Sequence, residues 1–139
     1  MAMRWHGGRV LVCDDNLLMA EVICDFVREC GFEPVGPVGE LESALHLARV
    51  RALDAAILNI DLNGRPCFPV CAILSARRVP FAFLTSYSGQ AVLVPVEYRW
   101  AAIIAKPFES NEMKAVLAQM LGLTDDPSAT DRMSPNLRH

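Results

Sequence analysis

The sequence predicts a single α/β domain, in which a doubly wound parallel sheet is packed between helices. Three observations lead to this fold class. Short apolar runs alternate along the chain with segments whose apolar residues recur every three or four positions. The length of 139 residues fits one domain. The hydrophobic fraction of 53% is sufficient for one packed core.

The first strand and helix are predicted from adjacent patterns. Residues 9–13 form a nearly continuous apolar run, which indicates a strand buried on both faces. The apolar residues between positions 18 and 30 are spaced three and four apart, which predicts an amphipathic helix. Asn16 can cap the start of this helix, and Gly31 can end it.

The middle of the chain continues the alternation. Residues 33–38 predict a weak strand that suits the edge of a sheet, because this segment contains two prolines. Residues 41–48 predict a second helix, and residues 54–60 predict a third strand. Residues 62–66 predict a turn from their Asn-Gly-x-Pro chemistry.

The remaining elements complete the pattern. Residues 68–77 predict a helix, and residues 80–85 predict another buried strand. Residues 86–99 are the least regular, and we expect a short or distorted helix there, flanked by loops. Residues 101–105 predict the last strand, and residues 113–122 predict a final amphipathic helix that stops at Gly122.

These elements define the expected boundaries. We expect an N-terminal extension at residues 1–8, the domain at residues 9–122 and a polar, flexible tail at residues 123–139. No apolar stretch at the start has the length of a signal peptide, and no run is long enough to span a bilayer. With five cysteines, an odd number, we expect reduced thiols and a cytoplasmic protein.

Charge and cysteine spacing exclude two other classes of site. The net charge is −3, and the nearest approach to a basic cluster is two arginine pairs, Arg49 with Arg51 and Arg77 with Arg78. We interpret these pairs as solvated helix ends, and we expect no binding of nucleic acid or membrane. Cys67 and Cys71 lack a second ligand pair at zinc spacing, so we expect them to be small buried hydrophobes.

Polar residues follow the predicted strands at the points where ligands bind in open α/β sheets. Asp14 and Asp15 follow the first strand, and Asn59 lies near the end of the third. Thr85 ends the fourth strand, and Lys106 follows the fifth. Because carboxyl ends of parallel strands lie at one edge, we expect two acids, an amide, a hydroxyl and an amine to converge there.

This pattern resembles the receiver domain family of the response regulators. The similarity rests on four motifs in order over residues 9–122: VLVCDD at residues 10–15, LNIDLNG at residues 58–64, Thr85, and Lys106 followed by proline. The resemblance implies a flavodoxin-like (βα)5 three-layer sandwich with parallel strands in the order 2-1-3-4-5. It also implies a role in two-component or phosphorelay signalling.

The resemblance also implies a role for each matched residue. Asp14 and Asp15 would bind Mg²⁺ together with the backbone carbonyl of Asp61, and hard oxygen ligands are those that Mg²⁺ prefers. Thr85 and Lys106 would contact the oxygens of a phosphoryl group, whose charge must be neutralised during transfer.

The departure from the family lies at the phosphoacceptor position, where the sequence has Asn59. An amide is a poor nucleophile and cannot form an acyl phosphate, so we expect no phosphorylation there. A family site has three carboxylates and a lysine, so the site of this sequence has one negative charge fewer. Two like charges about 4 Å apart repel by roughly 4 kcal/mol at an effective dielectric near 20. We therefore predict a stable metal-free state and a weakened Mg²⁺ site.

The leading functional hypothesis is a pseudo-receiver that acts through protein–protein interaction and is not an enzyme. The expected partner is a sensor histidine kinase, a phosphotransfer protein or another regulator. The resemblance places the docking face on the segment that begins at Gln90 and ends at Lys114, and it also allows a homodimer.

Three alternatives remain open at the level of sequence. The first is an ordinary phosphorylation switch in which Asn59, natural or engineered, replaced the acceptor. The second uses Asp61 as a substitute acceptor. The third is a flavin or nucleotide binder on the same fold, which we disfavour because Asp14 and Asp15 would repel a phosphate in the absence of a metal.

Overall fold

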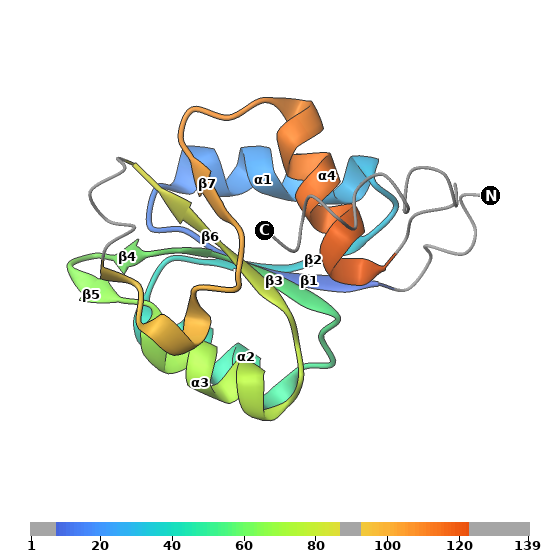
Figure 1. Cartoon of the computed structure of the whole chain (residues 1–139). Helices are drawn as coiled ribbons and strands as arrows, with labels where there is room; N and C mark the ends of the chain where they lie inside the picture. Colours follow the sequence, from blue (N-terminus) through green and yellow to red (C-terminus); the bar gives the residue numbers. More distant parts are fainter. Residues whose placement is uncertain (1–7, 87–92, 123–139) are drawn as a thin grey trace.

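The computed structural model describes residues 8–86 and 93–122, and its centre is a five-stranded parallel sheet (Figure 1). The strands of this sheet are Arg9–Cys13 (β1), Glu33–Val38 (β2), Ala55–Asn59 (β3), Phe81–Thr85 (β6) and Ile103–Ala105 (β7). They lie in the order β2-β1-β3-β6-β7 and pair in parallel throughout. This is the order 2-1-3-4-5 for the sheet strands alone, so the predicted fold class is confirmed.

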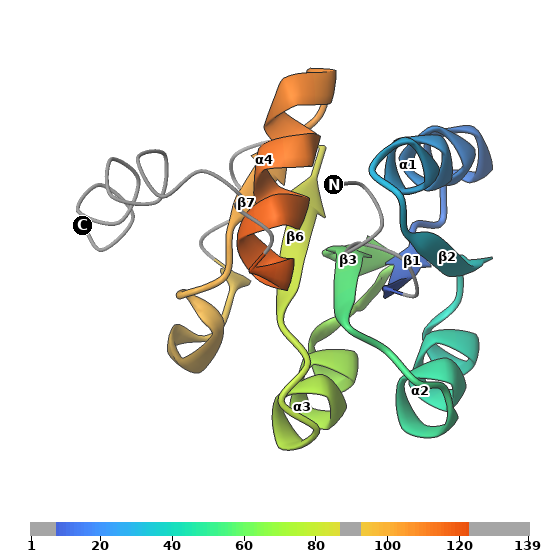
Figure 2. The ribbon, with the colours of Figure 1, turned by 90° about the vertical axis from the view of Figure 1, so that its right-hand side faces the viewer.

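Four α-helices cover the two faces of the sheet. They are Leu17–Glu29 (α1), Leu41–Val50 (α2), Phe68–Ala76 (α3) and Ser110–Leu121 (α4). Helices α1 and α4 lie on one face, and α2 and α3 lie on the other (Figures 1 and 2). The three layers are those of a doubly wound fold, in which helices cover both faces of a parallel sheet. Within the described residues, no helix is long and apolar enough to cross a membrane.

The core is divided by the sheet into two apolar clusters. Every residue of β3 and β6 is buried, which explains why these strands have continuous apolar sequences rather than alternating ones. On the α2–α3 side, Phe81 and Phe83 pack edge to face with ring centroids 5.5 Å apart. On the α1–α4 side, Ile23, Met113 and Leu117 fill the space against the sheet.

Local signals set the helix ends and the sheet edge. The side chain of Asn16 accepts a hydrogen bond from the Met19 N–H at 3.1 Å, so the predicted N-cap of α1 is confirmed. Gly122 has a φ of +64° and ends α4, as its position predicted. The proline-containing β2 is an edge strand, also as predicted.

Two connections differ from a regular βα repeat. The predicted turn at residues 62–66 is a small hairpin of Asp61–Leu62 (β4) and Arg65–Pro66 (β5). The crossover between β6 and β7 contains, in its described part, the 3-10 helix Val96–Tyr98, which fits the expected short helix. The rest of that crossover at residues 87–92, the tail at residues 123–139 and residues 1–7 of the predicted extension lie outside the described residues.

Candidate functional site

The candidate site lies at the edge of the sheet where β1, β3, β6 and β7 end. Asp14 follows β1, Asn59 is the last residue of β3 and Thr85 is the last residue of β6. Lys106 follows β7, and its backbone N–H donates to the Thr85 carbonyl at 2.9 Å. Parallel pairing of the four strands therefore gathers residues from four distant parts of the sequence, as the strand-end argument predicted.

Asp14 is fully buried, and both of its carboxylate oxygens are engaged. Oδ1 accepts the backbone N–H of Asn16 at 2.9 Å, and Oδ2 accepts the ammonium of Lys106 at 2.8 Å. The Lys106 side chain is itself only 12% exposed. A buried carboxylate must be paired or hydrogen-bonded to remain charged at low cost, and this ion pair meets that condition.

Asp15 joins the site to the hairpin beyond β3. Its Oδ1 accepts the side-chain amide of Asn59 at 3.2 Å, and its Oδ2 accepts the backbone N–H of Asn63 at 3.0 Å. Asn63 in turn donates its side-chain amide to the Gly39 carbonyl at 3.3 Å. The carboxylate of Asp15 thus connects the loop after β1 with two other loops of the same edge.

Asn59 lies at the centre of this arrangement and is 95% buried, with an exposed fraction of 5%. Its Nδ2 donates to the backbone carbonyl of Asp61 at 2.6 Å as well as to Asp15. The reverse amide orientation would bring Oδ1 against two acceptors, so the hydrogen bonds define the orientation. Within the described residues, Oδ1 is buried and has no hydrogen-bond partner.

Asp61 contributes its backbone and its side chain to different interactions. Its carbonyl accepts from Asn59, whereas its carboxylate Oδ2 accepts the Gly64 N–H at 3.1 Å inside the hairpin turn. Asn63 and Gly64 both have positive φ, at 54° and 85°, which is the backbone of a tight two-residue hairpin turn. The Asp61 carboxylate is therefore part of the turn.

The oxygens implied as Mg²⁺ ligands already accept hydrogen bonds from the chain itself. The Asn59 amide N–H groups occupy the Asp61 carbonyl and one Asp15 oxygen, and Lys106 occupies Asp14. A cation would have to displace these donors before it could bind the same oxygens. Across the part of the chain that the structure describes, no group of three His, Cys, Asp or Glu side chains could hold a metal ion.

Sequence reasoning placed Asp14, Asp15, Asn59, Thr85 and Lys106 at this edge, and the structure brings them together there. The supporting residues were not predicted. Asn63 was assigned only to a turn, although its backbone N–H binds Asp15. Gly39 packs against the acidic loop, where an added Cβ would lie 3.2 Å from the Asp15 Cα. The Asn-Gly pair at positions 63 and 64, which is typical of a tight hairpin turn, was the available signal for the contact between Asn63 and Asp15.

Comparison with known proteins places this architecture among signalling proteins. The chain is 31% identical over 123 residues to the DNA-binding response regulator MtrA of Mycobacterium tuberculosis (strain ATCC 25618 / H37Rv), a match that covers 87% of this chain and 54% of MtrA. The chain spans about half the length of the curated relatives it matches. A scan against protein-family models finds no match.

Solved structures share the fold of this chain. The solution structure of SdrG from Sphingomonas melonis Fr1 is 32% identical, with a TM-score of 0.73, and the match covers 82% of this chain and 96% of SdrG. The receiver domain of the sensor histidine kinase PA1611 from Pseudomonas aeruginosa PAO1 has a TM-score of 0.70 at 23% identity, covering 84% and 98%. That receiver domain has a magnesium ion coordinated in its active-site cleft.

The parallel sheet, the polar cluster at its carboxyl edge and these relatives define a signalling domain of the two-component systems. The chain belongs to the response regulator receiver family.

Proposed function

We propose that this chain is a pseudo-receiver: a signalling module that is not phosphorylated at Asn59 and that acts by binding other proteins. Asn59 lies at the end of β3, the place that the sequence resemblance gives to the acceptor. Its amide has no anionic oxygen with which to attack a phosphoryl donor, and phosphoryl transfer to a receiver needs such a nucleophile. On this proposal the chain is not an enzyme.

The hydrogen bonds of Asn59 carry the proposal. Its Nδ2 binds both Asp15 and the Asp61 carbonyl, the oxygens that the resemblance assigns to Mg²⁺. The partly positive amide hydrogens thereby contact the oxygens that a cation would otherwise coordinate. We infer that the domain holds this edge together without metal, and that Mg²⁺ binds more weakly here than in receivers with three carboxylates.

The remaining polar residues have assigned roles on the same proposal. Asp14 and Asp15 are the residual acids of the weakened metal site, together with the Asp61 carbonyl. Thr85, which is 1% exposed, and Lys106 hold the positions of the phosphoryl contacts. Lys106 is already engaged by Asp14, which supports a site that neutralises its own charge. We propose no flavin and no nucleotide as cofactor.

The partner on this proposal is a sensor histidine kinase, a phosphotransfer protein or another regulator. In the described part of the segment from Gln90 to Lys114, the apolar side chains of Leu93, Val96 and Ile103 are exposed, which supports a docking face there. A homodimer through the same face is a further form of this proposal. All five cysteines are free, which supports a reducing compartment such as the cytoplasm.

One observation favours a second candidate function, an ordinary phosphorylation switch in which Asn59, natural or engineered, stands for the acceptor. The edge of the sheet still brings together Asp14, Asp15, Thr85 and Lys106. A site that performs no phosphoryl transfer would have less need of all four, so their presence together favours a switch. A switch that used Asp61 instead is less well supported, because its carboxylate binds the Gly64 N–H in the turn.

The test is an intact-mass measurement after incubation with acetyl phosphate and Mg²⁺, for the wild type and for Asn59→Asp. We expect the wild type to remain unmodified and the variant to gain one phosphoryl group, about 80 Da. This result would show a site disabled at one residue. A phosphorylated wild type would contradict the proposal, and peptide mapping would then examine Asp61 first.

A further inference from the structure

The opposite end of the sheet carries a second polar feature that the candidate site does not use. Helices α2 and α3 both end there, next to the starts of β3 and β6. The guanidinium of Arg77 donates to the Ala48 carbonyl at 2.6 Å, so the two helix ends touch. The two arginine pairs of the sequence, at positions 49 and 51 and at positions 77 and 78, are therefore neighbours in space.

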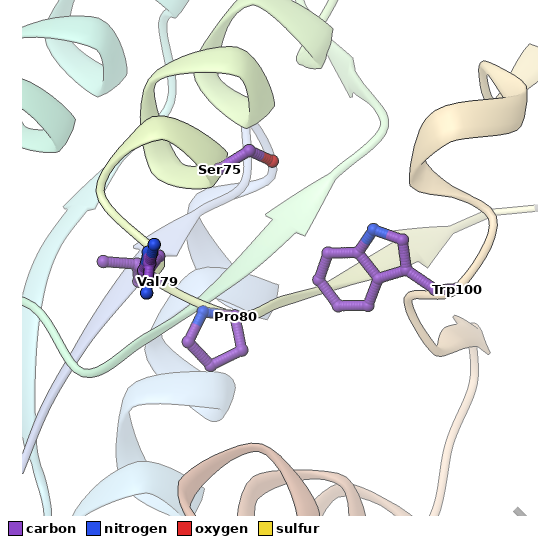
Figure 3. Close-up of a pocket in the computed structure, with 5 residues that line it drawn as sticks. Ser75, Val79, Pro80 and Trp100 are labelled. Carbon is purple, nitrogen blue, oxygen red and sulfur yellow. The ribbon is translucent and has the colours of Figure 1, made fainter.

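A cavity of about 270 Å³ opens beside one of these arginines, Arg78. Its lining residues are Ser75, Arg78, Val79, Pro80 and Trp100. The Trp100 indole and the Pro80 ring border the same space, and the Ser75 hydroxyl points toward it (Figure 3). Trp100 is 59% exposed, and its ring centroid lies 4.8 Å from that of the buried Phe81. The cavity thus has an aromatic wall and one cationic side chain, Arg78, in its lining.

The backbone of Arg78 shows that a long cationic side chain stands where a smaller residue is usual. Arg78 follows the end of α3 with a φ of 61°, a left-handed conformation that favours glycine or asparagine. Its side chain is exposed, and it has no ion-pair partner among residues 8–86 and 93–122. The guanidinium is therefore available to a ligand.

Two further guanidinium groups lie at the end of α2, which touches the end of α3. Arg49 and Arg51 also lack ion-pair partners in the described ranges. A local excess of guanidinium groups on a chain of net charge −3 favours a short acidic ligand over nucleic acid, whose many phosphates the rest of the surface would repel.

We propose that this end of the domain binds an acidic segment of a partner protein. An apolar side chain of the segment enters the cavity against Trp100 and Pro80, and flanking carboxylates pair with Arg78 and with Arg49 or Arg51. Arginine forks match carboxylates in geometry, and an aromatic anchor in a pocket is typical of binding hot spots. This surface is remote from the strand-end site, so the inference does not depend on the chemistry of Asn59.

The test uses Trp100 as its own reporter. The sequence has two tryptophans, so Trp5→Phe in the full chain leaves Trp100 as the single source of indole fluorescence. The probe is a synthetic peptide of glutamates with one central phenylalanine. We expect saturable quenching or a spectral shift that weakens as salt is added. In a ¹⁵N spectrum the Trp100 indole and residues 75–79 should shift, whereas Asn59 should not.

Substitutions identify the groups that recognise the peptide. Arg78→Asn removes the guanidinium while tolerating the left-handed backbone, and we expect about a tenfold loss of affinity, the effect of one charge-assisted hydrogen bond. The double variant Arg49→Gln, Arg51→Gln tests the end of α2 independently and should also weaken binding. The matched control is Arg28→Gln on α1, where Arg28 pairs with Asp25 and affinity should be unchanged.

Three results would overturn the proposal. The first is equal binding of a peptide with glutamine in place of every glutamate, because charge would then not be recognised. The second is tighter binding of a thymidine oligonucleotide of similar length, which would make nucleic acid the ligand. The third is an unchanged affinity in both the Arg78→Asn protein and the double variant.

Discussion

At the scale of single residues, one nitrogen atom distinguishes this site from a site with three carboxylates. The Asn59 Nδ2 donates to two oxygens that would otherwise face an anion at the same place. Asparagine and aspartate have nearly the same size, so the difference is electrostatic. A substitution that changes only the charge of this side chain is therefore the most informative test of how the edge is stabilised.

We predict that Asn59→Asp destabilises the metal-free protein by about 3 kcal/mol. Two hydrogen bonds are lost, and a buried carboxylate is placed beside Asp15. Mg²⁺ should restore much of this loss in the variant and little in the wild type, because it binds the folded state of the variant more tightly. Urea unfolding with and without Mg²⁺ measures both effects.

The matched control for that experiment is Asn111→Asp. Asn111 is exposed in the first turn of α4, away from the strand-end site. The same change of charge should therefore alter the free energy of unfolding by less than about 1 kcal/mol. Equal changes in the free energy of unfolding at the two positions would show that the buried contacts of Asn59 do not stabilise the fold more than an exposed asparagine does.

The ion pair of Lys106 with Asp14 gives a second residue-level prediction. Lys106→Met leaves the fully buried Asp14 carboxylate without its cation, and we expect a loss of about 3 kcal/mol or more in the free energy of unfolding. Lys114→Met is the control, because Lys114 lies 3.7 Å from Glu29 in an exposed pair and should contribute less than about 1 kcal/mol. Similar losses of unfolding free energy in the two variants would show that the buried ion pair of Lys106 is no stronger than the exposed pair of Lys114.

At the scale of elements, the loops after β1, β2 and β3 position the acids of the site. The Asp14 N–H donates to the Val38 carbonyl at 2.9 Å, and Gly39 follows directly in the loop after β2. A Cβ at position 39 would meet the Asp14 carbonyl oxygen at 3.3 Å and the Asp15 Cα at 3.2 Å. The loop after β2 thus fixes the backbone from which both carboxylates project.

We predict that Gly39→Ala disturbs this edge, because the atoms it would crowd belong to the backbone and cannot rotate away. The expected loss is about 1–2 kcal/mol in the free energy of unfolding, and the amide resonances of Asp15 and Asn63 should shift. Ser43→Ala, on the exposed side of α2, should change the free energy of unfolding by less than about 0.5 kcal/mol. Unshifted Asp15 and Asn63 resonances would contradict the packing.

Elements with a strong local signal could be predicted from the sequence. The Asn16 cap, the proline-rich edge strand and the buried strands β3 and β6 follow from patterns of a few adjacent residues. The strand-end positions of Asp14, Asn59 and Lys106 followed from the order of elements alone. Contacts between loops could not be predicted in this way, because Asn63 and Gly39 meet Asp15 only after the strands have paired.

At the scale of the whole molecule, buried thiols occur on both sides of the sheet. Cys13, Cys67 and Cys71 belong to the cluster beneath α2 and α3, and Cys24 belongs to the cluster beneath α1 and α4. Burial raises the pKa of the Cys13 thiol, and a hydrogen bond with Cys67 together with burial raises that of Cys71. These thiols remain neutral near pH 8, where the reactive form is the thiolate.

Native alkylation with iodoacetamide near pH 8 should therefore modify Cys30, the partly exposed cysteine, long before the four buried ones. All five should react once urea unfolds the chain, and intact mass counts the adducts. In Cys30→Ser the native protein should remain unmodified over the same period. Early modification of Cys24 without that of Cys13 would show that one layer opens independently of the other.

The amide of Asn59 has one further consequence, for the duration of a signal. An acyl phosphate decays by hydrolysis, and a bound ion exchanges with solution, so each gives a state a limited lifetime. The donors that bind Asp15 and the Asp61 carbonyl are part of the polypeptide, so they cannot leave the site as an ion or a phosphoryl group can. Under the proposed function, the state lasts as long as the chain, and a cell would adjust its output by synthesis and degradation of the protein.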